Sequence, residues 1–117
     1  MFAWIGEHPM AFDPTYHDDE PTREQIEQAT GSLVLEFGAS WCGHCQQLSS
    51  TVEAMFNQYP NLQHIRIADG KGKRLGRSFR VKLWPTLVFM REGEVLDVLV
   101  RPTAQDTRKS FERLQSK

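Results

Sequence analysis

The apolar positions of this chain fall into short runs separated by prolines, glycines and polar residues. The run at 33–37 is apolar except for Glu36, which predicts a strand buried on both faces. Similar runs predict three further strands, at 62–68, 86–90 and 95–100. The last two runs flank a short turn at 91–94, so we expect them to pair as an antiparallel hairpin.

Helical spacing is found between these runs. A long helix is predicted from about residue 42 to 59, because apolar residues recur on one face and Pro60 follows them. Three shorter helices are also predicted: one opened by a capping box at Thr22 and Gln25 and stopped at Gly31, one within 71–79, and one that opens at Thr103.

Residues 1–20 are aromatic and acidic without clear periodicity, and prolines there oppose a long helix. We expect an arm or one weak edge strand near Phe12. The element order over 21–117 predicts an α/β fold with a central mixed sheet and helices on both faces. With 117 residues, the chain is expected to form a single domain, 1–117, that buries its own core.

Composition narrows the possible functions. The formal net charge of -1 provides no global attraction for nucleic acid or a membrane surface. The N-terminal segment lacks a signal-peptide pattern, and no apolar run approaches the ~20 residues of a membrane span, so we expect a cytoplasmic protein. The stretch 71–82 is basic, but its glycines do not match a phosphate-binding loop, which favours a solvated helix face.

The chemistry is concentrated in two cysteines, Cys42 and Cys45, at the start of the long predicted helix. The N-terminal N–H groups and dipole of a helix favour a thiolate at Cys42, while Cys45 lies one turn further on, within reach of a disulfide. We expect Cys42 to attack a substrate disulfide and Cys45 to resolve the mixed disulfide. Trp41 is expected to cover one side of the site, and Gly43 to let a partner's backbone approach.

A structural zinc site is the main alternative for a C-x-x-C pair, and it needs about four ligands. The chain has no second cysteine pair, and His8, His17 and His64 are scattered without ligand spacing. We therefore expect no metal, and we expect these three histidines to be surface residues. Two buried thiols without a function are the remaining alternative.

Two segments carry a resemblance to a known family. The string from Glu36 to Cys45, with Trp84-Pro85-Thr86 about forty residues later, resembles the thioredoxin superfamily, and the element order matches over roughly 22–116. The Cys-Gly-His-Cys form is typical of protein disulfide isomerase domains. The resemblance implies a thioredoxin fold, a cis-proline at Pro85 facing the cysteines, and substrate docking on the backbone around Trp84 and Thr86.

The resemblance also implies how such a protein works. Its substrates would be protein disulfides, and an NADPH-dependent thioredoxin reductase would recharge it. It would need no bound cofactor, because the electrons reside on the Cys42–Cys45 pair. We further expect a monomer. A disulfide oxidase or isomerase in an oxidising compartment, and a redox-silent binding module with the same fold, stay open as alternatives.

Two side chains near the pair are expected to tune it. Glu36, buried and unpaired, would tend to hold a proton, and the resemblance implies that it accepts the proton of Cys45 through water. A strand-end Glu that reaches solvent is the alternative. His44 could stabilise the Cys42 thiolate by a hydrogen bond or by charge, or it could be an exposed residue without a role.

The chain also departs from the family pattern. Gly38 stands where an aromatic residue is often found, Ser50 replaces a helix proline, and Trp84 replaces a small aliphatic residue. Arg101-Pro102 stands where a glycine normally flattens the docking surface. We therefore expect a reshaped groove and a narrower range of substrates.

Overall fold

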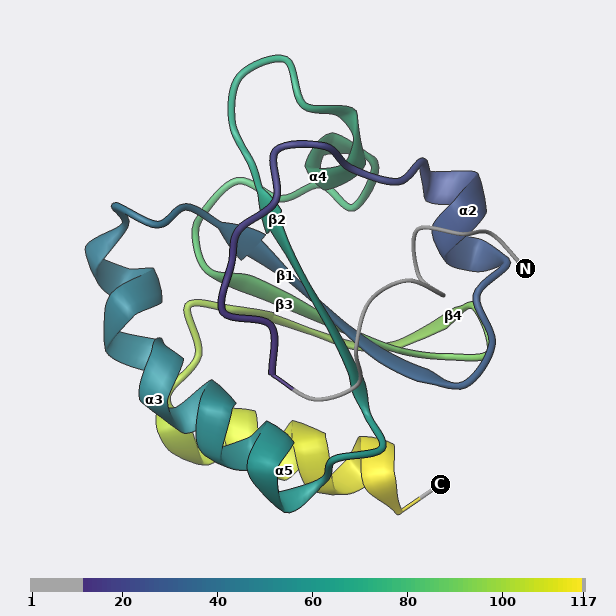
Figure 1. Ribbon diagram of the computed structural model, residues 1–117, viewed down its shortest axis with the longest axis vertical. Coiled ribbons are helices and arrows are strands. Elements are labelled where there is room, and N and C mark those ends of the chain that lie inside the picture. Colours follow the sequence, from purple (N-terminus) through teal and green to yellow (C-terminus); the bar gives the residue numbers. More distant parts are fainter. Residues whose placement is uncertain (1–11, 117) are drawn as a thin grey trace.

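Four strands form one mixed sheet at the centre of the molecule, in the order β2-β1-β3-β4 (Figure 1). The computed structural model describes residues 12–116. β1 pairs in parallel with β2 and antiparallel with β3, and β3 pairs antiparallel with β4. The predicted α/β class and the hairpin are confirmed. The strands are β1 (Ser32–Gly38), β2 (Gln63–Ala68), β3 (Thr86–Arg91) and β4 (Glu94–Val100).

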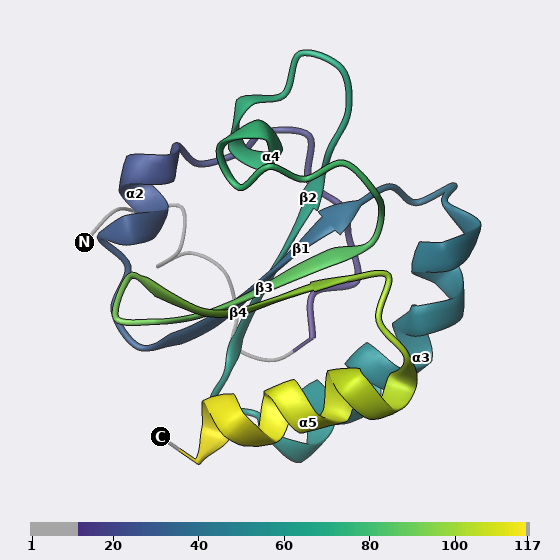
Figure 2. The same cartoon turned by 180° about the vertical axis from the view of Figure 1, so that it is seen from behind.

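Helices cover both faces of this sheet. The described residues form α2 (Arg23–Glu27), α3 (Gly43–Gln58), α4 (Arg74–Ser78) and α5 (Ala104–Gln115). Figures 1 and 2 show α3 and α5 side by side on one face, with α2 and α4 on the other. No helix within 12–116 is long and apolar enough to cross a membrane.

Local sequence signals define where these helices begin. At α2, the Thr22 hydroxyl accepts a hydrogen bond from the Gln25 N–H, and the Gln25 side chain accepts one from the Thr22 N–H, which confirms the capping box. α2 ends at Glu27, earlier than predicted. Thr103 caps α5 through the Asp106 N–H. Cys42 is the N-cap residue of α3.

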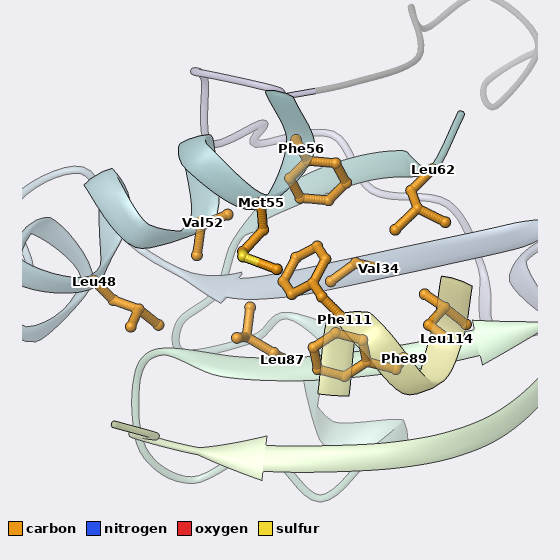
Figure 3. Packing of buried hydrophobic residues seen from close by; sticks show 10 residues of the cluster. All are labelled: Val34, Leu48, Val52, Met55, Phe56, Leu62, Leu87, Phe89, Phe111 and Leu114. Atoms are coloured by element: carbon orange, nitrogen blue, oxygen red, sulfur yellow. The ribbon is translucent and has the colours of Figure 1, made fainter. Parts of the chain in front are cut away.

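A closely packed core fixes α3 and α5 to the sheet (Figure 3). The Phe111 ring of α5 meets Phe56 and Phe89 edge to face, at centroid distances of 5.0 and 5.2 Å. Val52 and Met55 of α3 are buried in the same cluster. A second buried cluster lies on the face covered by α2 and α4. The anchored helix α3 therefore holds its N-terminus in a fixed position at the end of β1.

The N-terminal segment runs along the outer edge of β2. His17 forms a single parallel bridge with Ile67, its N–H donating to the Arg66 carbonyl and its own carbonyl accepting from the Ala68 N–H. The edge strand expected near Phe12 is thus one bridge at His17. His8 lies outside the described residues. The bridge positions Tyr16 over the end of β1, near the start of α3.

The basic segment around α4 faces acidic and backbone oxygens of this arm. The Glu20 carboxylate accepts hydrogen bonds from the Arg74 and Leu75 N–H groups, and the Lys73 ammonium donates to the Asp18 carbonyl. The backbone donors at the start of α4 are thus already used. A phosphate-binding role for this segment gains no support from this arrangement.

Candidate active site

The two cysteines lie where the chain leaves β1 and enters α3. The Sγ atom of Cys42 accepts a hydrogen bond from the Cys45 backbone N–H at 3.2 Å. Both residues are free thiols, with 7% of Cys42 and 2% of Cys45 exposed. Sulfur at the N-terminus of a helix, beside a backbone donor, is placed where negative charge is stabilised.

Two tryptophans form an aromatic wall beside the pair. The rings of Trp41 and Trp84 meet edge to face with centroids 5.5 Å apart, and Trp41 is 74% exposed. The Trp84 indole N–H donates to Asp69 Oδ2 at 2.9 Å, which fixes the ring. At Gly43 an added Cβ would meet no atom of the described residues within 4 Å. The surface next to Cys42 is therefore open at Gly43 and bounded at the tryptophans.

The segment entering β3 forms the third side of the site. The Trp84–Pro85 peptide bond is cis, and the buried Thr86 donates its hydroxyl proton to the Leu83 carbonyl at 2.7 Å. Arg101 is bonded to this segment twice: its Nε donates to the Trp84 carbonyl at 2.7 Å, and its N–H donates to the Pro85 carbonyl at 2.9 Å. The Arg101 guanidinium is thus hydrogen-bonded to the Trp84 carbonyl, on the segment beside the cysteines.

Arg101 also has an unusual backbone. Its φ angle of 47° lies in the left-handed region that favours glycine. The same residue borders a groove of about 200 Å³ beside the exposed His44. The groove is lined by His44, Gln47, Leu48, Thr51, Pro85, Arg101, Pro102 and Ala104.

Glu36 is completely buried, but it is not unpaired, so the expectation of a protonated carboxyl is wrong. Its Oε1 accepts from His64 Nε2 at 2.8 Å and from Arg66 Nε at 3.1 Å, and its Oε2 accepts from the Tyr16 hydroxyl at 3.0 Å. Burial alone would raise the pKa of Glu36, but hydrogen bonds and charge from His64 and Arg66 outweigh it and hold this pKa below its usual range. Glu36 is therefore a carboxylate.

His64 lies in the core and not on the surface, which corrects the sequence interpretation. Its ring is fully buried and stacks on Phe56, with centroids 4.3 Å apart. Nδ1 accepts the Asp13 backbone N–H at 2.9 Å, so the ring proton resides on Nε2 and is donated to Glu36. Burial holds the pKa of His64 below its usual value. The imidazole is neutral and acts as a hydrogen-bond donor to the carboxylate.

Tyr16 connects this buried network to the cysteines. The tyrosine packs against the cluster that contains Ala39, Cys42 and Cys45, and its proximity lowers the pKa of Cys45. Burial nevertheless dominates and raises the pKa of Cys45 to about 11. Cys45 is therefore a neutral thiol at neutral pH.

Tyr16, His64 and Arg66 were not identified from the sequence. The register of β1 and β2 places Glu36 opposite Arg66 and Val34 opposite His64, so the two basic residues share the face of the sheet that carries Glu36. The only sequence signal was the i, i+2 spacing of polar residues within an otherwise buried strand. In the part of the chain that the structure describes, no three His, Cys, Asp or Glu side chains gather as a metal site.

Comparison with known proteins connects this site to one family. The family model for thioredoxin matches residues 14–112. The chain is similar to thioredoxin H1 of Arabidopsis thaliana, with 29% identity over 87 residues that cover 72% of this chain and 76% of that protein. Thioredoxin H5 of the same plant is 30% identical over 87 residues, covering 72% and 74% of the two chains.

Solved structures give the same result. Thioredoxin 2 of Pseudomonas aeruginosa PAO1 in its reduced form superimposes with a TM-score of 0.81 and 40% sequence identity, over 90% of this chain and 98% of that chain. The thioredoxin NaTrxh of Nicotiana alata superimposes with a TM-score of 0.68 at 21% identity, over 78% and 79% of the chains, and supports the fold alone.

Proposed function

Because this chain belongs to the thioredoxin family and is a thiol–disulfide oxidoreductase, we propose that it reduces protein disulfides with Cys42 as nucleophile and Cys45 as resolving thiol. The observation that carries this assignment is the hydrogen bond from the Cys45 N–H to Cys42 Sγ at the start of α3. That donor and the helix N-terminus stabilise a thiolate on Cys42 as it attacks.

Reduction then proceeds in two exchanges. The Cys42 thiolate attacks one sulfur of the substrate disulfide, which forms a Cys42–substrate disulfide and releases the first substrate thiolate. Cys45 gives up its proton and attacks Cys42 Sγ, which forms the Cys42–Cys45 disulfide and releases the second thiolate. The two electrons come from the pair itself, so the reaction needs no cofactor. Glu36 supports the second step as the buried proton acceptor.

The surrounding residues determine which disulfides reach Cys42. In the proposed complex, the substrate backbone lies along Trp84, Pro85 and Thr86, with Trp41 covering one side and Gly43 leaving room. His44 faces the groove and interacts with the attacking sulfur. The bond from Arg101 to the Trp84 carbonyl supports a restricted substrate range, because a substrate N–H has to displace the guanidinium to reach that carbonyl.

Several wider features belong to the same proposal. Residues 1–117 form one thioredoxin-like domain that acts as a monomer in the cytoplasm, where a thioredoxin reductase using NADPH regenerates the dithiol. The small number of cysteines, two in 117 residues and both in the site, supports a reducing compartment because it leaves none for structural disulfides.

An insulin reduction assay with dithiothreitol tests the assignment. Wild-type protein is expected to accelerate precipitation of the reduced insulin chains, and Cys42→Ser is expected to lose this acceleration completely. Tyr59→Phe lies at the C-terminal end of α3, away from the cysteines at its start, and serves as a mutated but redox-competent control once circular dichroism shows that it is folded. A wild-type protein without activity would favour the redox-silent binding module.

A further inference from the structure

In the resolving step Cys45 has to give up its proton. The buried Glu36 carboxylate could accept it, but its hydrogen-bond partners are Tyr16, His64 and Arg66 and not the Cys45 thiol. Burial raises the pKa of Cys45 to about 11 in the dithiol, so this thiol keeps its proton at neutral pH. Glu36 is the buried carboxylate at this end of the sheet. Tyr16 lies between the two: its hydroxyl donates to Glu36, and its side chain packs against the cluster that contains Cys45.

The two carboxylate oxygens of Glu36 have different partners, and one of them, Oε2, is bonded to Tyr16. His64 and Arg66 both donate to Oε1, whereas Tyr16 donates to Oε2 at 3.0 Å. Because the Tyr16 hydroxyl proton points to Oε2 in this hydrogen bond, the lone pairs of the Tyr16 oxygen are available to accept the S–H proton of Cys45. The three groups are thus arranged as thiol, hydroxyl and carboxylate, in the order that proton transfer requires.

Gly38 provides the space for this arrangement. A Cβ at position 38 would lie 2.5 Å from Cys45 Sγ, 3.1 Å from Tyr16 Cε1 and 3.2 Å from the Tyr16 hydroxyl. Any side chain there would therefore separate the thiol from the tyrosine. Gly38, which departs from the family pattern, therefore leaves the space in which Tyr16 of the N-terminal arm lies close to Cys45.

The charged and titratable groups around Tyr16 come from three elements. Glu36 faces it from β1, Cys45 from α3, and the Arg66 guanidinium from β2, where Arg66 Cζ lies 4.8 Å from the ring centroid. Burial and the nearby Glu36 charge keep the pKa of Tyr16 far above its usual value, so its hydroxyl stays protonated. Tyr16 can pass a proton on without becoming a lasting phenolate.

We propose that the Tyr16 hydroxyl relays the proton of Cys45 to Glu36 during the resolving step. This inference rests on the proposed roles of Cys42 and Cys45. As Cys45 Sγ bonds to Cys42 Sγ, the Cys45 proton moves to the Tyr16 oxygen and the Tyr16 proton moves to Glu36 Oε2. The bond between Cys42 and the substrate sulfur breaks, and the substrate leaves as a thiolate. Glu36 afterwards returns its proton through Tyr16 to the leaving thiolate or to solvent.

The relay is concerted with bond formation. Transfer from a thiol of raised pKa to a carboxylate of lowered pKa is unfavourable by itself, but the charge that develops on Cys45 passes into the breaking S–S bond. A pocket of about 290 Å³ borders Tyr16, Cys45, Ser49 and Arg66 and provides a route to solvent for the returned proton.

The two thiol exchanges can be timed separately with dithiobis(nitrobenzoate) in a stopped-flow instrument. Attack by Cys42 releases the first thionitrobenzoate, and attack by Cys45 on the mixed disulfide releases the second. Tyr16→Phe keeps the ring and removes the relay, so the second release is expected to slow by about 100-fold at pH 7, the lower end of what general-base catalysis contributes. The deficit should shrink as pH rises toward 11, while the first release stays unchanged.

Tyr59→Phe is the matched control, because the Tyr59 hydroxyl accepts from Gln58 and lies at the far end of α3. It is expected to show wild-type rates for both releases. A second release unchanged in Tyr16→Phe across the pH range would overturn the relay and favour transfer through pocket water. Equal slowing of both releases would also overturn it, because Tyr16 would then support the whole site.

A second test of the relay uses the wild-type protein alone. The rate of the second release is measured in mixtures of H₂O and D₂O. Two protons in flight predict a curved dependence on the deuterium fraction, and a linear dependence contradicts the relay. Failure of the proposed function has a different signature, since a rapid first release by Cys42→Ser would contradict the role of Cys42 whatever Tyr16→Phe does.

Discussion

His64 Nε2 lies 2.8 Å from Glu36 Oε1, and both side chains are completely buried. The imidazole thus holds in place a carboxylate that would otherwise be an unpaired buried charge, a costly arrangement. Replacing the ring leaves the Asp13 N–H and Glu36 without this partner. We expect His64→Leu to lower the free energy of unfolding at pH 7 by about 1–3 kcal/mol, measured by urea denaturation. His44→Gln, at an exposed position, is the control and should leave it unchanged.

The same pair makes stability depend on pH. The pKa values of His64 and Glu36 are both lowered in the folded state from ordinary values of 6.5 and 4.5. Below these values the unfolded chain binds protons that the folded chain does not, so stability is lost as pH falls. We expect the free energy of unfolding to decrease from about pH 6.5 downward and again below about pH 4.5. In His64→Leu the contribution of His64 between pH 5 and 7 should disappear; a slope equal to that of wild type would contradict this assignment.

Gly38 is required by close contact with the second cysteine. In Gly38→Ala the new Cβ would lie 2.5 Å from Cys45 Sγ, so the thiol or Tyr16 has to move. We expect a loss of about 1–3 kcal/mol in stability, the usual cost of overpacking, together with slower disulfide reduction. Gly43→Ala is the stability control, because its Cβ meets open space, and its unfolding midpoint should not fall. Equal effects of the two substitutions would contradict the packing argument.

Arg101 is expected to restrict docking. Arg101→Ala removes the guanidinium from the Trp84 carbonyl but keeps a side chain at the same φ, whereas Arg101→Gly also relieves the left-handed conformation. Both variants should lower KM for a protein disulfide substrate, with little change in the rate toward a small aromatic disulfide. Arg101→Gly should in addition be more stable than Arg101→Ala by about 1 kcal/mol. An unchanged KM in both would mean that the carbonyl takes no part in docking.

His44 lies in the first turn of α3 and borders the groove. We expect an imidazole there to stabilise negative charge on the nucleophilic sulfur, which would favour the dithiol and make the pair more oxidising. We expect His44→Pro to shift the reduction potential to a more negative value in glutathione-buffer titrations. A potential that stays the same or rises would show that His44 does not tune the pair.

The sequence predicted those parts of the protein that depend on local signals. Apolar runs, the capping box at Thr22 and the position of Cys42 before a helical stripe each act within a few residues, and the four strands and four helices predicted from them are present in the structure. The surroundings of Glu36 could not be predicted this way. They depend on the parallel register that sets Arg66 opposite Glu36 and on an N-terminal arm whose attachment is a single bridge at His17. Neither the register of the two strands nor the attachment of the arm produces a periodic pattern in the sequence.

The most direct test of the assigned roles is to trap the intermediate with a disulfide-bonded peptide and identify it by mass spectrometry. Cys45→Ser is expected to accumulate a stable mixed disulfide between the peptide and Cys42, because the thiol that resolves it is gone. Cys42→Ser is expected to form none at neutral pH, since burial raises the pKa of Cys45 and only 2% of this residue is exposed. Wild-type protein should pass through the adduct and end as the Cys42–Cys45 disulfide with reduced peptide. An adduct on Cys45 in Cys42→Ser, formed as fast as the adduct on Cys42, would contradict the account.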